Sequence, residues 1–208
     1  MRIGIIGAGK IGGTLARLWT EQGHEVAVSN SRGPETLAEL VSTLGPLARA
    51  TTPAEAAAFG EVVVVSVPLG HYQQVPTTGV AGKPVIDTNN YYPQRDGQIS
   101  PLDDASTTSS ELLQKHLPDA LVVKAFNQIR WTNLGSDGVP AGTQGRTGIP
   151  IAGDDAGAKK VVADLIEQIG FDAVDTGALS TGRLFQPNTS LYVPNVTADL
   201  IRQVVASS

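Results

Sequence analysis

The chain has 208 residues, of which 41% are hydrophobic, and its formal net charge at pH 7 is −5. This length suits one domain with a full core, and the mild acidity favours neither nucleic acid nor an anionic membrane as a partner. Because the chain contains no cysteine, disulfides, thiolate catalysis and thiolate metal ligands are excluded.

The first thirty residues predict a strand, a glycine-rich turn, a helix and a second strand. Arg2 to Ile6 reads as a strand and runs directly into Gly7-Ala8-Gly9-Lys10-Ile11-Gly12, after which apolar residues recur at helical spacing as far as Trp19. Glu25 to Ser29 predicts the next strand. The unit is therefore βαβ, with G-x-G-x-x-G in the position that the dinucleotide fingerprint requires.

Each glycine of this motif has its own expected task. Gly7 permits the tight turn, Gly9 lets the backbone approach a pyrophosphate, and Gly12 lets the helix pack close to the strand. The amides of Lys10 and Ile11 lie at a helix N-terminus, where unpaired N–H groups and the helix dipole favour an anion. We therefore predict that these five residues bind a dinucleotide cofactor.

The end of the second strand distinguishes between the two nicotinamide cofactors. An NAD site usually has an acidic residue here, whereas an NADP site supplies an arginine for the 2′-phosphate. The chain reads Ser29-Asn30-Ser31-Arg32, and the first carboxylate after this stretch is that of Glu35. These four residues predict a site for NADP(H).

The chain then alternates between predicted helices and apolar strands. Helices are expected over Pro34 to Leu44, after Thr52 and from Thr108 to His116, and strands over Leu47 to Thr51, Glu61 to Val67, Val85 to Thr88 and Ala120 to Ala125. Six strands that alternate with helices predict an α/β fold with a doubly wound, mostly parallel Rossmann sheet.

The remaining residues predict a small continuation of the same sheet. Strands are expected over Ile149 to Ala152 and Phe171 to Asp175, with a helix from Asp154 to Ile169 between them and a last helix over Val196 to Val205. Residues Asn133 to Gly148 are rich in Gly, Ser and Thr and predict a loop over the ligand crevice. We expect one domain, with a dinucleotide-binding core at 1–130 and an extension at 131–208.

Ligands of such sheets bind beyond the carboxyl ends of the strands, so the residues after each strand are candidates for the site. The candidates are Val67, Pro68 and His71 after the fourth strand, Asn89 after the fifth, and Ala125 and Asn127 after the sixth. The aromatic residues Tyr72, Tyr91, Tyr92, Phe126 and Trp131 are expected to wall a flat pocket, in part or in whole. Lys124 is expected to pack its stem and extend its amine to solvent.

The chemistry of these candidates favours positioning over acid–base catalysis. No serine-histidine-aspartate series or carboxylate pair suggests hydrolysis, and the three histidines show no metal-ligand spacing. Hydride transfer between two ring systems depends mainly on positioning. We therefore assign no acid–base residue, keep His71 and Asn127 as positioning candidates, and expect an oxidoreductase without a metal site.

These residues resemble the family of coenzyme F420-dependent NADP oxidoreductases, which is related to the cytosolic domain of STEAP-type metalloreductases. The resemblance covers nearly the whole chain, and its most specific block runs from Pro150 to Asp155 and continues through Lys159 to Val162 and Asp175 to Leu184. It implies that Gly9 to Ile11, Ser31, Arg32, Val67, His71 and Ala125 contact NADP(H). It also implies reversible hydride transfer to the deazaflavin F420, and a homodimer through C-terminal elements.

Two departures from the family pattern concern the second substrate. The loop Asn89 to Pro93 does not match the archaeal reductases, and Asn127 stands where those tend to have a histidine. A flavin or another small redox acceptor therefore stays open as the alternative to F420, as does a redox sensor that binds NADP(H) without turnover.

The sequence also predicts where the protein resides. The first strand begins at Arg2, with no signal segment expected before it, and the longest strongly apolar run, Val62 to Val67, is too short to span a bilayer. We expect a cytoplasmic protein that contacts neither a membrane nor nucleic acid.

Overall fold

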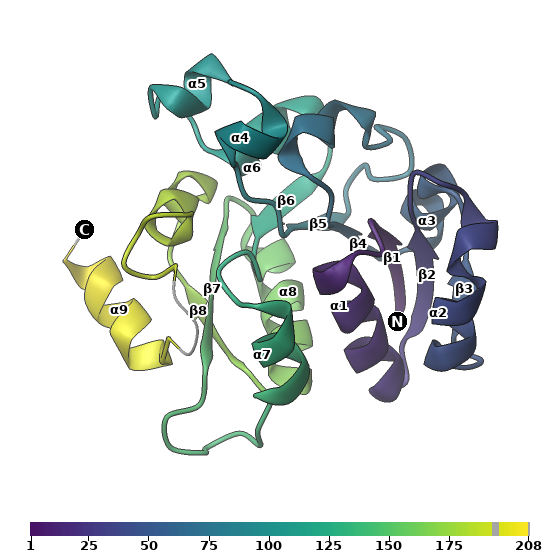
Figure 1. Cartoon of the computed structure of the whole chain (residues 1–208). Helices are drawn as coiled ribbons and strands as arrows, with labels where there is room; N and C mark the ends of the chain where they lie inside the picture. The colour runs from purple at the N-terminus through teal and green to yellow at the C-terminus, as the bar shows by residue number, and fades with distance from the viewer. Residues whose placement is uncertain (193–195, 208) are drawn as a thin grey trace.

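The computed structural model describes residues 1–192 and 196–207, whose strands form one continuous eight-stranded sheet (Figure 1). The strands are β1 (Arg2–Ile6), β2 (Glu25–Ser29), β3 (Ala48–Ala50), β4 (Val62–Val65), β5 (Pro84–Asp87), β6 (Leu121–Lys124), β7 (Gly148–Gly153) and β8 (Asp172–Asp175). Their spatial order is β3-β2-β1-β4-β5-β6-β7-β8. All neighbouring pairs are parallel except β6 and β7. The predicted doubly wound, mostly parallel sheet is confirmed.

Helices cover both faces of the sheet. The α-helices are α1 (Lys10–Glu21), α2 (Ala38–Leu44), α3 (Pro53–Phe59), α4 (Pro93–Asp96), α5 (Ser100–Asp103), α6 (Ser109–His116), α7 (Trp131–Ser136), α8 (Ala156–Gln168) and α9 (Ala198–Ala206). Three 3₁₀ helices, η1 (Pro34–Leu37), η2 (Leu69–Gln74) and η3 (Leu179–Phe185), complete the set among the described residues. Thr52 and Thr108 form the capping boxes that start α3 and α6.

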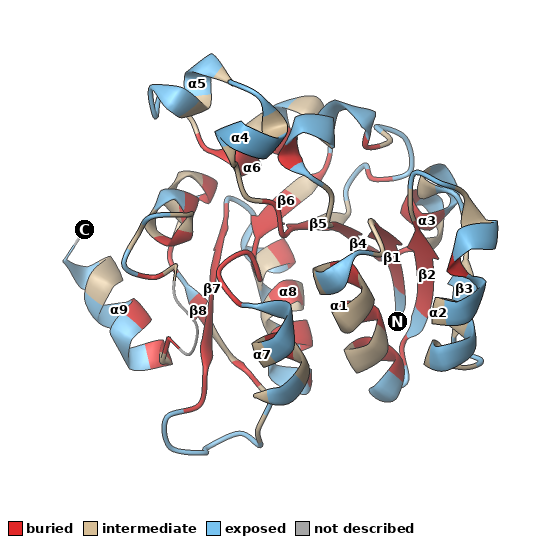
Figure 2. Ribbon diagram, in the orientation of Figure 1, coloured by how far each residue is buried: buried red, intermediate tan, exposed pale blue. Residues whose placement is uncertain are grey.

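Two apolar layers hold the sheet between these helices. One layer includes Trp19 of α1 and Leu165 of α8, and the other includes Ala57 of α3 and Leu113 of α6. Strand β4 is buried along its whole length because neighbouring strands and helices cover it on every side. Figure 2 shows the same pattern, with buried residues on the strands and exposed residues on the outer helices.

The C-terminal continuation joins the sheet in the opposite direction. Strand β7 pairs antiparallel with β6, β8 pairs parallel with β7, and α8 connects them as a crossover helix. Helix α9 buries Ala198 and Ile201 in a third apolar cluster with residues of β7 and β8. The predicted extension of the sheet is therefore confirmed, and the predicted helix at Val196 to Val205 is present as α9.

One expectation for this region was wrong. The segment Asn133 to Gly148 was expected to be a loop over the ligand crevice, but its beginning belongs to α7, which packs against α1. The rest turns toward the connection between α8 and β8, where the Val139 amide donates to the Gly170 carbonyl and Arg146 pairs with Glu167 and Asp172. A buried arginine with two carboxylate partners ties the segment down there.

Candidate active site

Two cavities lie at the carboxyl ends of the parallel strands. The first, of about 430 Å³, is lined by Ile6, Gly7, Ala8, Gly9, Asn30, Ser31, Arg32, Pro53, Ser66, Val67, Pro68, His71, Gln74 and Val75. The second, of about 540 Å³, is lined by Gly9, Lys10, Ile11, Ser66, Val67, Pro68, Thr88, Asn89, Asn90, Tyr92, Arg95, residues 126–132 and Tyr192. The two share Gly9 and Ser66 to Pro68, so a long ligand can pass from one to the other.

The glycine turn between β1 and α1 has the three separate geometries that the motif predicts. Gly7 has φ +104°, and a Cβ on it would lie 2.1 Å from the Ser66 carbonyl oxygen. A Cβ on Gly12 would lie 2.0 Å from the Gly7 carbonyl oxygen, whereas one on Gly9 would meet nothing within 4 Å. Gly7 and Gly12 are therefore needed by the fold, and the open side of Gly9 leaves room for a ligand at the N-terminus of α1.

The turn after β2 is built by side chains before any ligand binds. Asn30 accepts a hydrogen bond from the Arg32 amide at 2.9 Å through Oδ1 and donates to Thr36 Oγ1 at 2.8 Å through Nδ2. Thr36 in turn donates to the Gly33 carbonyl at 2.8 Å. This Asx turn holds Ser31 and Arg32 exposed at the edge of the first cavity, where an arginine can pair with a phosphate.

Asn89 lines the second cavity and bonds to the boundary that this cavity shares with the first. Its Oδ1 accepts a hydrogen bond from the Val67 amide at 3.0 Å, and its own amide donates to Asp87 Oδ1 at 2.9 Å. Its carbonyl accepts from the Lys124 amine at 3.1 Å. Asn89 thus links the ends of β4 and β5, and Asp87 and Lys124 behind it hold Asn89 in place.

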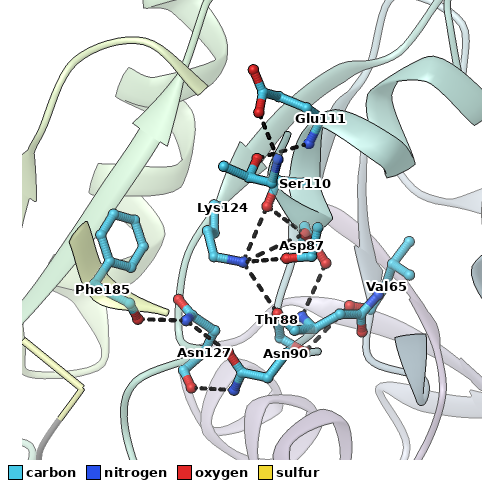
Figure 3. Close-up of polar contacts among 12 residues, drawn as sticks. Val65, Asp87, Thr88, Asn90, Ser110, Glu111, Lys124, Asn127 and Phe185 are labelled. Atoms are coloured by element: carbon cyan, nitrogen blue, oxygen red, sulfur yellow. Dashed lines mark hydrogen bonds and ion pairs between the residues drawn. The ribbon is translucent and has the colours of Figure 1, made fainter. Parts of the chain in front are cut away.

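That polar group centres on Lys124, whose position differs from the prediction. The side chain is fully buried, and its amine lies 3.1 Å from the hydroxyls of Ser109 and Ser110 and 3.9 Å from Asp87 Oδ2 (Figure 3). Burial lowers the pKa of Lys124, and the Asp87 carboxylate only partly opposes this. The expectation that the amine reaches solvent was wrong, because β6 ends under α6 and η3, which cover it.

Two aromatic side chains, Trp131 and Tyr92, wall the second cavity, and the Phe126 ring lies buried behind it. Trp131 at the start of α7 is 45% exposed, and the Lys10 amine lies 5.4 Å from its ring centroid. Phe126 is buried edge-on against Trp19 and has φ +62°, an uncommon conformation for a residue other than glycine. Tyr92 carries the Arg95 guanidinium 4.9 Å above its ring. Flat apolar walls and cations therefore meet in one cavity.

Amide side chains supply the polar wall. Asn90 and Asn127 form a reciprocal pair, in which Asn127 Nδ2 donates to Asn90 Oδ1 at 3.0 Å and Asn90 Nδ2 donates to the Asn127 carbonyl at 2.7 Å (Figure 3). Asn127 Nδ2 also donates to the Phe185 carbonyl at 2.8 Å. This pairing links the loops after β5 and β6 to η3.

Unpaired buried polar atoms concentrate at the same cavity. Among the described residues, the buried side-chain atoms without a partner are Asn89 Nδ2, Asn127 Oδ1 and Gln128 Oε1, and all three residues line the second cavity. A buried polar atom left unpaired costs about 1–3 kcal/mol. Their grouping therefore indicates a wall suited to a polar ligand or ordered water.

The sequence analysis missed Tyr192 and Arg95 as lining residues. The Tyr192 hydroxyl contacts the Tyr92 hydroxyl and accepts a hydrogen bond from Asn90 Nδ2 at 3.3 Å. Burial raises the pKa of Tyr192. Tyr192 lies one hundred residues from its partner Tyr92, and no local motif surrounds it. Arg95 is nearer, since it directly follows a candidate loop.

The structure separates the predicted site residues into two groups. Those that line a cavity are Gly7, Gly9, Lys10, Ile11, Asn30, Ser31, Arg32, Val67, Pro68, His71, Asn89 and Asn127. Gly12, Ser29 and Ala125 are buried and line neither cavity; Ser29 instead accepts the Gly7 and Ala8 amides through its carbonyl. These three residues shape the site from behind.

Two expectations about rings need correction, whereas His71 lines the first cavity with Arg32. Tyr72 packs edge-on against His116, with ring centroids 5.9 Å apart. Tyr91 binds Asp103 and the Gly97 carbonyl through its hydroxyl and so holds the loop between α4 and α5. Neither Tyr72 nor Tyr91 lines the pocket.

Within residues 1–192 and 196–207, no group of three or more His, Asp or Glu side chains is arranged to hold a metal ion. In the same part of the chain, no helix combines the length and the apolar character that crossing a bilayer requires.

The Rossmann sheet and the glycine turn, with two joined cavities at the carboxyl ends of the strands, define the class of dinucleotide-binding Rossmann proteins. The sequence model of the family described as "NADP oxidoreductase coenzyme F420-dependent" matches residues 2–91. A structure of a hypothetical protein from Sinorhizobium meliloti is 30% identical, with a TM-score of 0.78 over 95% of this chain and 93% of that one. The chain belongs to this family.

Two further relatives agree with this assignment. A candidate F420-dependent NADP-reductase from Arthrobacter sp. FB24 is 28% identical, with a TM-score of 0.76, over 88% of this chain and 87% of that chain. Metalloreductase STEAP3 of Rattus norvegicus is 31% identical over 186 residues, which is 88% of this chain but only 35% of the rat protein. The chain thus spans about a third of that relative.

Proposed function

We propose that the protein transfers a hydride between NADP(H), bound along the first cavity, and coenzyme F420, bound in the second. The observation that carries the proposal is the shared boundary of the two cavities at Gly9 and Ser66 to Pro68. A dinucleotide whose phosphates lie at the N-terminus of α1 would reach the second cavity with its nicotinamide, which supplies the hydride when the cofactor is bound.

The residues of the first cavity fit NADP(H). The side of Gly9 that a Cβ would fill is open, which leaves room for a pyrophosphate beside free helix amides. Arg32 and Ser31 extend from a prebuilt turn, where they would bind the 2′-phosphate. We assign Val67, Pro68 and Asn89 to the nicotinamide end, because Val67 and Pro68 line both cavities and Asn89 bonds to the Val67 amide.

The residues of the second cavity fit a planar acceptor with an anionic tail. Trp131 and Tyr92 supply flat walls, and Lys10, Arg95 and Arg130 place positive charge around them. Both features suit F420, and the family name supports that choice.

We also propose the homodimer that the resemblance implies, which light scattering of the purified chain would test.

A flavin reductase is the second candidate, because the same walls and cations suit FMN. The loop Asn89 to Pro93 also departs from the loop of the archaeal reductases. The two candidates thus share one reaction, hydride transfer from NADPH, and differ only in the acceptor.

The test is to mix the purified protein with NADPH and, in separate cuvettes, F420, FMN or FAD, and to follow the absorbance of each acceptor. We expect F420 to be bleached fastest. Faster bleaching of a flavin would replace F420 with the second candidate, and tight NADPH binding without turnover of any acceptor would favour a redox sensor. The Gly9→Ala variant serves as the control for cofactor dependence.

A further inference from the structure

We propose that Tyr192 is the proton donor to the acceptor in the second cavity, with Tyr92 as the group that restores its proton. This inference rests on the proposed function, because it names the residue that completes the reduction after hydride transfer. It assigns an acid–base role that the sequence analysis did not expect at this site.

The first step of the argument counts hydroxyl protons. The two tyrosine hydroxyls contact each other, and each has one proton to donate. If Tyr92 donates to Tyr192, the proton of Tyr192 has no acceptor among the described residues. If Tyr192 donates to Tyr92 instead, the proton of Tyr92 has no acceptor among them. One hydroxyl proton of the pair is therefore always free for a ligand in the cavity that both residues line.

The second step decides which hydroxyl donates. Asn90 Nδ2 donates to the Tyr192 oxygen at 3.3 Å. When Tyr92 also donates to the Tyr192 oxygen, both lone pairs of that oxygen are occupied. The Tyr192 proton then points away from Asn90 and Tyr92. Asn90 Nδ2 would still donate to the Tyr192 oxygen after the proton leaves.

The third step concerns how the pair is held. Asn90 is fixed by the reciprocal pair with Asn127 (Figure 3). Arg95 donates to the Asn90 carbonyl at 2.8 Å. Arg95 also lies over the Tyr92 ring. Burial raises the pKa of Tyr192, so the hydroxyl is protonated when the acceptor binds.

The acceptor class that this arrangement fits is a conjugated ring or carbonyl that gains a hydride and a proton. The hydride forms a new bond to the acceptor, and an electron pair moves to a nitrogen or oxygen of the same conjugated system. That atom takes the Tyr192 proton, Tyr192 regains a proton from Tyr92, and Tyr92 regains one from solvent. NADPH, the acceptor and one proton give NADP⁺ and the reduced acceptor.

The test compares Tyr192→Phe and Tyr92→Phe with Tyr72→Phe, a matched control whose ring packs against His116 outside the cavity. Single-turnover reduction of F420 and of FMN by NADPH is followed between about pH 6 and pH 8, and NADPH affinity is measured by fluorescence. Loss of a general acid costs about 10²- to 10⁴-fold in rate. We expect that loss in Tyr192→Phe, a smaller one in Tyr92→Phe, and NADPH affinity within about twofold of wild type.

The pH profile separates a proton donor from a structural residue. The wild-type rate should be flat across this range because Tyr192 stays protonated, whereas the Tyr192→Phe rate should fall as pH rises because hydronium must then supply the proton. A Tyr192→Phe variant with a wild-type rate and a flat profile would overturn the proposal.

A second readout needs no turnover. 4-Nitrophenol is planar, and its absorbance distinguishes the anion from the neutral form. We expect the wild-type protein to bind the anion about tenfold more tightly than Tyr192→Phe does, because one charged hydrogen bond is lost. If the protein bleaches neither F420 nor a flavin, the proposed function fails while this titration still decides the role of Tyr192. Equal binding by both proteins would overturn it.

Discussion

The first and second cavities adjoin each other but are built in different ways. The first depends on backbone geometry within short stretches, namely the glycine turn at residues 7–12 and the Asx turn at residues 30–36. The second depends on side chains brought together from residues 89–95, 126–132 and 192. A backbone site binds what many relatives share, such as a pyrophosphate, whereas a side-chain site can change its ligand by substitution. We therefore expect the second cavity to set the protein's own specificity.

The largest effect should come from the buried polar group behind the second cavity. Lys124→Met leaves Asp87 buried without its cation, and removing one member of a buried pair typically costs about 3–5 kcal/mol. We expect that loss in urea unfolding, with part of it restored in Lys124→Met/Asp87→Asn. Lys160→Met, which removes an exposed amine, is the control and should change stability by less than about 0.5 kcal/mol. An equal effect of both single variants would contradict the prediction.

The same pair predicts a pH dependence of stability. The pKa of Lys124 is lowered in the folded state from its ordinary 10.5. At pH values between the lowered pKa of the folded state and 10.5, the unfolded chain therefore holds a proton that the folded chain has released. Stability then rises with pH through that window. The stability of wild type relative to Lys124→Met should therefore increase as pH rises toward 10.5. Parallel unfolding curves across this range would show that Lys124 does not titrate there.

Gly9→Ala tests the backbone site of the first cavity. The added Cβ meets no protein atom, so the unfolding free energy should stay within about 0.5 kcal/mol of wild type. It would occupy the room proposed for the pyrophosphate, so NADPH affinity should fall about 100-fold, the upper end of what overpacking costs. Gly13→Ala, whose Cβ would lie 3.8 Å from the nearest atom, is the matched control and should leave binding intact. Calorimetry with NADPH measures both variants.

Arg32→Ala tests the choice of cofactor. A charged hydrogen bond contributes about 1.5–3 kcal/mol, so NADPH affinity should fall about 10- to 100-fold while NADH affinity stays almost unchanged. Arg17→Ala removes a cation that pairs with Glu21 on α1 instead, and it serves as the control. Equal weakening of both cofactors would remove Arg32 from the 2′-phosphate site.

Asn30→Ala should have the smallest effect, because Asn30 acts through the turn that it builds. The loss of its bonds to Arg32 and Thr36 should weaken NADPH binding about 3- to 10-fold, which is the cost of about one neutral hydrogen bond. Thr36→Val interrupts the same turn and should give a similar loss. Fluorescence titration measures both, and unchanged affinity in the two variants would show that the turn holds its shape without them.

The sequence by itself determined the sheet, its strand ends and the first cavity. Continuous apolar runs such as Val62 to Val65 and the G-x-G-x-x-G motif are local patterns, and their geometry follows from steric limits on a few consecutive residues. For the same reason the turn through Arg32 could be assigned before its hydrogen bonds were known.

Only the tertiary structure decided the second cavity. Asn90 and Tyr192 are 102 residues apart, and Asn127 and the Phe185 carbonyl are 58 apart, so no local pattern announces their contact. The burial of Lys124 likewise depends on α6 and η3, which pack over the end of β6. Side-chain sites form where segments distant in sequence pack together, and the free energy that holds these segments in place comes from packing across the whole fold.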